Sequence, residues 1–194
     1  INNMDGIALV INSQFRNNGF GALQTNRPPY VLPQQLTDGG AMNSENSIVI
    51  VCGSQFYQNV TGQEGGALSN ISCFVEVYSS QFWNNFAANG AAMINADSEV
   101  LLVNSLFNNN TVNNIGGALY NAACPMVQIT NCTMADNLAK GFYGGAIASV
   151  ASQISDTLRY DLNIDNSMLW GNLATYIINN QIYLKNTNLY LDSY

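Results

Sequence analysis

The chain has 194 residues, a formal net charge of −7 and only 9% Asp, Glu, Lys and Arg, against about 25% in an ordinary soluble domain. It contains no histidine and five basic residues. This composition excludes a His-based catalytic triad, a His metal site and a basic surface that follows nucleic-acid phosphates. The 47% hydrophobic content favours a folded chain, and no apolar run is long enough to span a membrane.

An S-x-F-x-x-N motif recurs along the chain. Its copies, the last two of them looser, begin at Ser13, Ser54, Ser80, Ser105, Cys132 and Ser167. The third position of the motif, called the anchor below, advances by 26, 25 and 27 residues between Phe56 and Met134. Such a period indicates a solenoid, in which each repeat buries its apolar face against the next.

A second motif, G-G-A followed by Leu, Ile or Met, comes after the anchors. Its copies begin at Gly39, Gly65, Gly90, Gly116 and Gly144, and the copy at Gly90 reads G-A-A-M. Paired glycines suit a crowded corner that has no room for Cβ atoms. Two stretches are longer than the repeat requires, and we expect loop insertions near 24–38 and 151–160.

Apolar columns alternate with mixed columns when the repeats are aligned on the anchor. The residues five before it are Val10, Val51, Val77, Leu102, Ile129 and Ile164. Alternation with a period of two predicts half-buried strands. Stacked strands of this kind form an all-β, parallel β-helix of about seven coils, roughly 30–35 Å long. We expect a single β-helix domain over 1–194 that is part of a longer chain.

Many of the 30 asparagines also fall into columns. Three residues after the anchor stand Asn18, Asn59, Asn85, Asn110, Asn137 and Asn172. Three residues before it stand Asn12, Gly53, Ser79, Asn104, Asn131 and Asn166. Asparagine tolerates left-handed backbone and bonds to nearby backbone, so both columns predict turns, with hydrogen bonds between stacked amides.

The F-x-x-N and G-G-A-[IL] pair resembles the repeat of polymorphic outer membrane proteins and related secreted surface proteins, over about residues 8–191. The resemblance implies a right-handed parallel β-helix of the pectate-lyase-like class. That family includes adhesins and autotransported passengers. The repeats are structural positions, so they predict the fold more closely than the function.

Enzymes on this fold are mostly polysaccharide lyases and hydrolases, which use paired acids and a base. Asp161 and Asp165 lie on one face of a predicted strand, and Asp97 and Glu99 are close in sequence. The remaining acids are scattered over different columns. We therefore expect solvated surface charge, no enzyme activity, no metal and no cofactor, with a carbohydrate-active protein as the alternative.

Cysteine and sequon positions suggest covalent modifications of a secreted protein. A disulfide between Cys124 and Cys132 across a turn is possible, although Cys132 falls in an inward column that favours a buried thiol. Sequons begin at Asn59, Asn70, Asn109 and Asn131. Asn59 lies in the turn column, which leaves Asn70, Asn109 and Asn131 as the glycosylation candidates.

One outward column, one residue after the anchor, carries aromatic side chains. Tyr57 and Trp83 are predicted neighbours, and Trp170 stands three coils further on. Exposed stacked aromatics bind sugar rings or partner proteins. Together these features predict an extracellular or cell-surface structural or adhesive β-helix. Its expected partners are other copies, surface or filament subunits, or glycans, and stacking or lateral contacts would build a filament.

Overall fold

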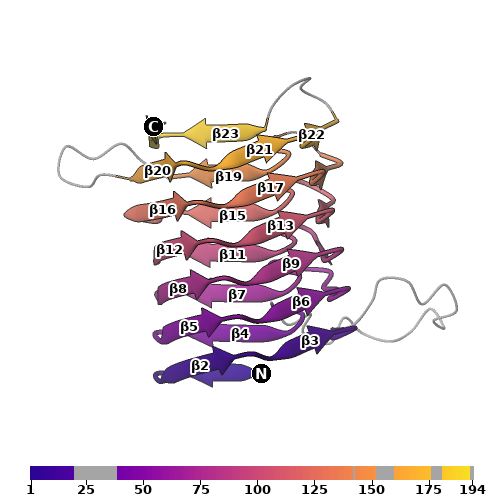
Figure 1. Cartoon of the computed structure of the whole chain (residues 1–194), viewed down its shortest axis with the longest axis vertical. Helices are drawn as coiled ribbons and strands as arrows, with labels where there is room; N and C mark the ends of the chain where they lie inside the picture. The colour runs from indigo at the N-terminus through magenta and orange to yellow at the C-terminus, as the bar shows by residue number, and fades with distance from the viewer. Residues whose placement is uncertain (20–38, 142, 152–159, 176–180, 193–194) are drawn as a thin grey trace, which may run out of the picture.

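The computed structural model describes residues 1–19, 39–141, 143–151, 160–175 and 181–192. All regular structure in these ranges is β-strand, and the strands stack into four parallel sheets (Figure 1). The predicted parallel β-helix is therefore confirmed, and its two largest sheets each contain seven strands, one from each coil.

The two seven-stranded sheets are called sheet A and sheet B. Sheet A contains β1 (Asn2–Met4), β4 (Met42–Glu45), β7 (Leu68–Ile71), β11 (Met93–Ala96), β15 (Leu119–Ala122), β19 (Ile147–Val150) and β23 (Ile182–Lys185). Sheet B contains β2 (Ile7–Ile11), β5 (Ile48–Cys52), β8 (Phe74–Tyr78), β12 (Glu99–Val103), β16 (Met126–Thr130), β20 (Asp161–Asp165) and β24 (Asn188–Asp192).

Two smaller sheets complete the coils. Sheet C contains β3 (Gln14–Arg16), β6 (Gln55–Tyr57), β9 (Gln81–Trp83), β13 (Leu106–Asn108), β17 (Thr133–Ala135) and β21 (Met168–Trp170). Sheet D contains β10 (Phe86–Ala87), β14 (Thr111–Val112), β18 (Leu138–Ala139) and β22 (Leu173–Ala174).

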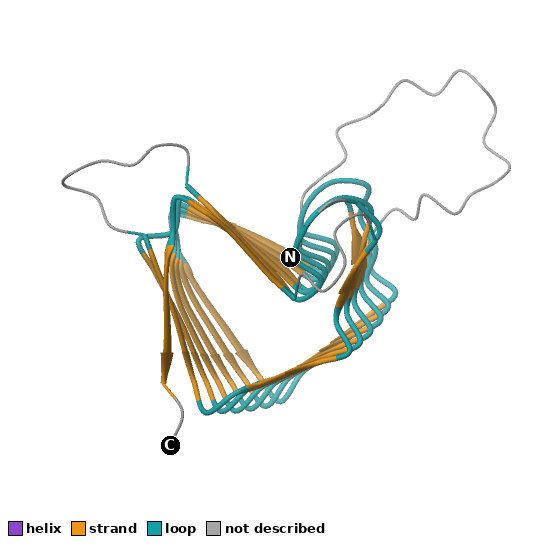
Figure 2. Cartoon of the chain, turned by 90° about the horizontal axis from the view of Figure 1, so that it is seen from above, coloured by secondary structure: helices purple, strands orange, loops and turns teal. Residues whose placement is uncertain are grey.

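The chain passes through sheets A, B and C in turn and, from β10 onwards, through sheet D before it returns to sheet A. In Figure 1 sheets B and C cross the front from left to right, and sheet A returns behind them while the chain climbs from the N-terminus. The view from above shows the same circuit as a set of superposed turns (Figure 2). The coil is therefore right-handed, as the repeat resemblance implies.

The anchor column forms the centre of the core. Phe15, Phe56, Phe82 and Phe107 stack at centroid distances of 4.8, 4.8 and 5.0 Å, with nearly parallel rings. Met134 continues the stack and is fully buried. One hydrophobic cluster extends from Val10 to Ile164, so the aliphatic columns predicted to point inward do so.

The asparagine column three residues after the anchor is a continuous internal ladder. From Asn18 to Asn172, each amide Nδ2 donates to the Oδ1 of the next asparagine at 2.8–3.0 Å. The same oxygen accepts the backbone N–H of the preceding rung at 3.0–3.2 Å. Gln181 Oε1 accepts from Asn172 at 2.9 Å and closes the ladder.

Left-handed residues form the corners of the coils. The column three residues before the anchor has positive φ throughout, as predicted. At the next corner the left-handed residue precedes the ladder asparagine, as Asn84 does before Asn85. The ladder asparagines thus serve as hydrogen-bonding rungs, whereas we had also expected them to supply left-handed backbone.

The predicted insertions near 24–38 and 151–160 lie almost wholly outside the described residues. The strand registers are consistent with extra length at both places, because Phe15 pairs with Phe56 and Met134 with Leu169. In the described part of the chain, no helix is long and apolar enough to cross a membrane.

Candidate functional site

The predicted aromatic column does not form one surface. Tyr57 and Trp83 do stack, with centroids 4.5 Å apart and planes within 5°. Their ring faces therefore point at each other along the coil axis, and only the ring edges face outward. Asn108 and Ala135 separate this pair from Trp170, which is 71% exposed. Within the described residues of this column, a sugar ring that stacks on an aromatic face would find such a face at Trp170 or at the two ends of the pair.

The three glycosylation candidates differ in exposure. Asn109 and Asn131 are exposed, left-handed corner residues. Asn70 is fully buried, and its Nδ2 donates to Asn95 Oδ1 at 3.0 Å. The prediction that Asn70 is an outer-surface sequon is wrong, because this residue belongs to a second internal ladder that alignment on the anchor alone did not show.

The structure keeps Cys124 and Cys132 as free thiols. They lie at opposite ends of β16, and a five-residue strand is roughly 16 Å long, whereas a disulfide needs Cα atoms within about 7 Å. The predicted pairing is therefore not formed. Both thiols are buried, and burial raises the pKa of Cys124 to about 12 and also raises the pKa of Cys132.

In the described ranges, no group of three or more His, Cys, Asp and Glu side chains is placed to hold a metal ion. Asp161 and Asp165 do share the outer face of β20, as predicted, and Asp161 accepts a 2.8 Å hydrogen bond from Asn188. Among the basic residues, Lys140 places its Nζ 5.4 Å from the centroid of the Phe86 ring. Arg159 lies outside the described residues.

A concave region of about 740 Å³ lies over β21, between β17, β20, β23 and β24. Its lining is made of apolar, amide, hydroxyl and thiol side chains, and none of these described residues carries a charge. An acid and a base for lyase or hydrolase chemistry are thus not found together here.

The outer face of sheet B is strongly apolar in its first coils, although alignment of the repeats predicts mixed columns there. In the first two coils all its residues are apolar, namely Ile7, Leu9, Ile11, Ile48, Ile50 and Cys52. Phe74, Leu101 and Val103 continue this surface in the next two coils, with Glu76 and Glu99 among them. We call the outer face of β2, β5, β8 and β12 the apolar face.

The apolar face is solvent-exposed: Ile48 and Phe74 are 42% and 44% exposed. The sheet becomes polar further along the rod, where Asp161 and Asp165 occupy β20. Among its described outward residues there is no lysine or arginine. An exposed apolar surface of this extent is typical of an interaction site.

Comparison with known proteins gives one informative similarity. A curated protein of Escherichia coli (strain K12), "Probable autotransporter YfaL", is 35% identical over an alignment of 114 residues, and the match covers 50% of this chain and 9% of that protein. No family model matches the chain, so the specific polymorphic outer membrane protein repeat stays a prediction. No solved structure matches it either. The chain is thus similar to a short part of a probable autotransporter and spans about 9% of that protein's length.

Proposed function

We propose that this chain is a segment of a cell-surface protein in which it serves as a stiff adhesive rod. The similarity to a probable autotransporter supports a surface location. The parallel β-helix supports the rod, because every coil is hydrogen-bonded to its neighbours through at least two sheets. An adhesive role rests on the apolar face.

The partner that the apolar face fits best is a second copy of the same face. A flat sheet packs against another flat sheet at about 10 Å through interdigitating apolar side chains. Two copies placed with their rods parallel bring the apolar coils of one against the apolar coils of the other. Glu76 and Glu99 lie within the face on β8 and β12, so the contact is centred on β2 and β5, whose outward residues are all apolar.

The size of the face predicts weak association. Four strands at 4.8 Å, each five residues long, cover about 300 Å² per copy. A stable dimer buries about 800 Å² per partner. We therefore expect a dissociation constant on the order of 0.1–1 mM in solution, and much stronger attachment where many copies are held side by side on a surface.

Sedimentation equilibrium of the chain between about 10 μM and 1 mM tests this proposal. The wild type should show reversible self-association, and Ile48→Glu with Phe74→Glu should abolish it, because a desolvated carboxylate in the contact is costly. Gln128→Glu is the control, since it adds a carboxylate to the same sheet one coil beyond the apolar face. It should associate like the wild type.

A wild-type chain that stays monomeric at 1 mM would overturn self-contact through this face. So would equal association of the double variant and the control. Thermal unfolding of all variants should be measured in parallel, so that loss of association is not confused with loss of the fold.

A further inference from the structure

A second polar ladder runs along the inner side of sheet A. Asn70, Asn95, Asn121 and Ser149 occupy the same register position in four successive coils. Each amide Nδ2 donates to the oxygen of the next rung, at 3.0, 2.9 and 3.0 Å. All four residues are buried. The ladder therefore satisfies most of its polar atoms internally.

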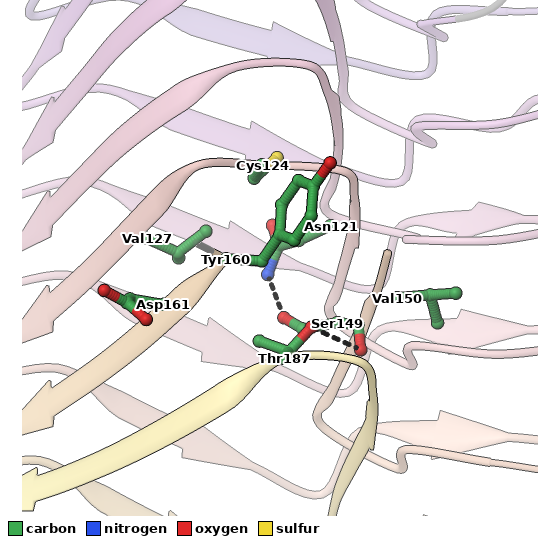
Figure 3. A pocket seen from close by; sticks show the side chains of 8 residues that line it. All are labelled: Asn121, Cys124, Val127, Ser149, Val150, Tyr160, Asp161 and Thr187. Atoms are coloured by element: carbon green, nitrogen blue, oxygen red, sulfur yellow. Dashed lines mark hydrogen bonds between the residues drawn. The ribbon is translucent and has the colours of Figure 1, made fainter. Parts of the chain in front are cut away.

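The C-terminal end of this ladder is tightly closed. Asn121 donates to Ser149 Oγ, and Thr187 Oγ1 donates to the Ser149 backbone oxygen at 3.3 Å (Figure 3). Cys124 and Tyr160 line the same place, and the space between these side chains is too small for a water molecule. At this rung a serine is sufficient to end the ladder.

The N-terminal end differs, although it also has a serine. Asn3, Ser44 and Asn70 stand in register in three successive coils. The buried atoms Asn3 Nδ2, Ser44 Oγ and Asn70 Oδ1 have no hydrogen-bond partner within the described chain. Ser44 and Asn70 are wholly buried. Buried polar groups are nearly always bonded to protein or to ordered water, so three in adjacent rungs require an explanation.

We propose that ordered water bound at Ser44 completes this ladder. An asparagine at position 44 would accept from Asn3 and donate to Asn70, as the other asparagines do with their neighbours. Serine lacks the amide, and the side-chain volume that it leaves is roughly that of one water molecule, about 30 Å³. The site is polar and enclosed, which are the conditions under which buried water is retained.

The chemistry of the three atoms identifies water rather than an ion. Asn3 Nδ2 is a donor, Asn70 Oδ1 is an acceptor, and the Ser44 hydroxyl is both. A cation would be repelled by the Asn3 amide hydrogens, and an anion by the Asn70 carbonyl oxygen. Water donates and accepts, so it matches the set.

The same substitution at the two serines of this ladder tests the proposal. Ser44→Asn should replace the water by an amide that belongs to the chain. The unfolding midpoint should rise by about 2–4 °C, because folding then no longer immobilises a water molecule. Ser149→Asn should lower the midpoint, since there is no room for the amide. Equal shifts of the same sign in both variants would overturn the proposal.

A crystal structure of the wild-type chain at about 1.5 Å provides an independent test. The expected result is an ordered water within hydrogen-bond distance of Ser44 Oγ and of Asn70 Oδ1 or Asn3 Nδ2. A structure in which these atoms bond to each other, without water, would overturn the proposal. This second measurement decides the question even if Ser44→Asn does not fold.

Discussion

Asn85 donates 3.0 Å hydrogen bonds to Asn110 Oδ1 in the next coil and to the Phe56 backbone oxygen in the preceding one. Its own Oδ1 accepts from the backbone N–H and the side chain of Asn59. One buried amide thus links three coils, and the low charge of the chain is consistent with such stacking, because like charges about 5 Å apart would repel each other.

Asn85→Ala should therefore lower the free energy of unfolding by about 3 kcal/mol or more, since it leaves several buried donors and acceptors unpaired. Urea denaturation monitored by circular dichroism measures this. Asn113 is an exposed asparagine in a neighbouring coil, and Asn113→Ala should change stability by less than about 0.5 kcal/mol. Similar losses in both variants would show that the ladder is not a main source of stability.

The second glycine of the G-G-A motif lies at a corner where the backbones of successive coils approach closely. A Cβ at Gly66 would collide with the backbone oxygens of Ala91 and Phe86. A Cβ at Gly6 would meet chiefly the side-chain oxygen of Asn3, which can move. Gly66→Ala should thus destabilise the fold by about 3 kcal/mol, and Gly6→Ala by much less. Thermal unfolding of the two variants compares them directly, and a tolerated Gly66→Ala would contradict this packing.

The buried thiols predict how stability depends on alkaline pH. Burial raises the pKa of Cys124 from 9.0 to about 12, so the folded chain keeps a proton that the unfolded chain releases. This contribution to stability is complete below pH 9 and is lost as the pH rises towards 12. Urea midpoints should fall between pH 9 and 11. Cys124→Ser should fall less steeply, and an identical slope would argue against a buried Cys124.

Sequon occupancy should follow exposure. When the chain is secreted from a glycosylating host, folded material should carry glycans at Asn109 or Asn131 and none at Asn70, whose Nδ2 is bonded inside sheet A. Peptide mass spectrometry of the folded fraction measures the occupancy of each site. A folded fraction with a glycan on Asn70 would contradict the second ladder.

The fold was predictable because each structural position recurs in every coil, so its residue preference is seen several times in one sequence. The phenylalanine anchors and the asparagines after them predict the core and the first ladder from the sequence alone. The second ladder also had a signal, since Asn70 and Asn121 each stand four residues after the second glycine of their motif, at Gly66 and Gly117. Alignment on the anchor alone obscured it.

The surface was harder to predict for a physical reason. Inward positions are constrained by packing, whereas outward positions tolerate many residues, so Ile48 and Phe74 looked like members of mixed columns. The repeat also does not determine the direction of a side chain. It predicts that Tyr57 lies beside Trp83, but not that their ring faces stack against each other.

The most direct test of the proposed adhesive role is clustering of beads that carry the chain at high density. Beads coated with wild-type chain should cluster reversibly, and beads coated with the Ile48→Glu, Phe74→Glu double variant at equal density should stay dispersed. The Gln128→Glu control should cluster like the wild type. Dispersed wild-type beads, or equal clustering of all three coatings, would contradict adhesion through the apolar face.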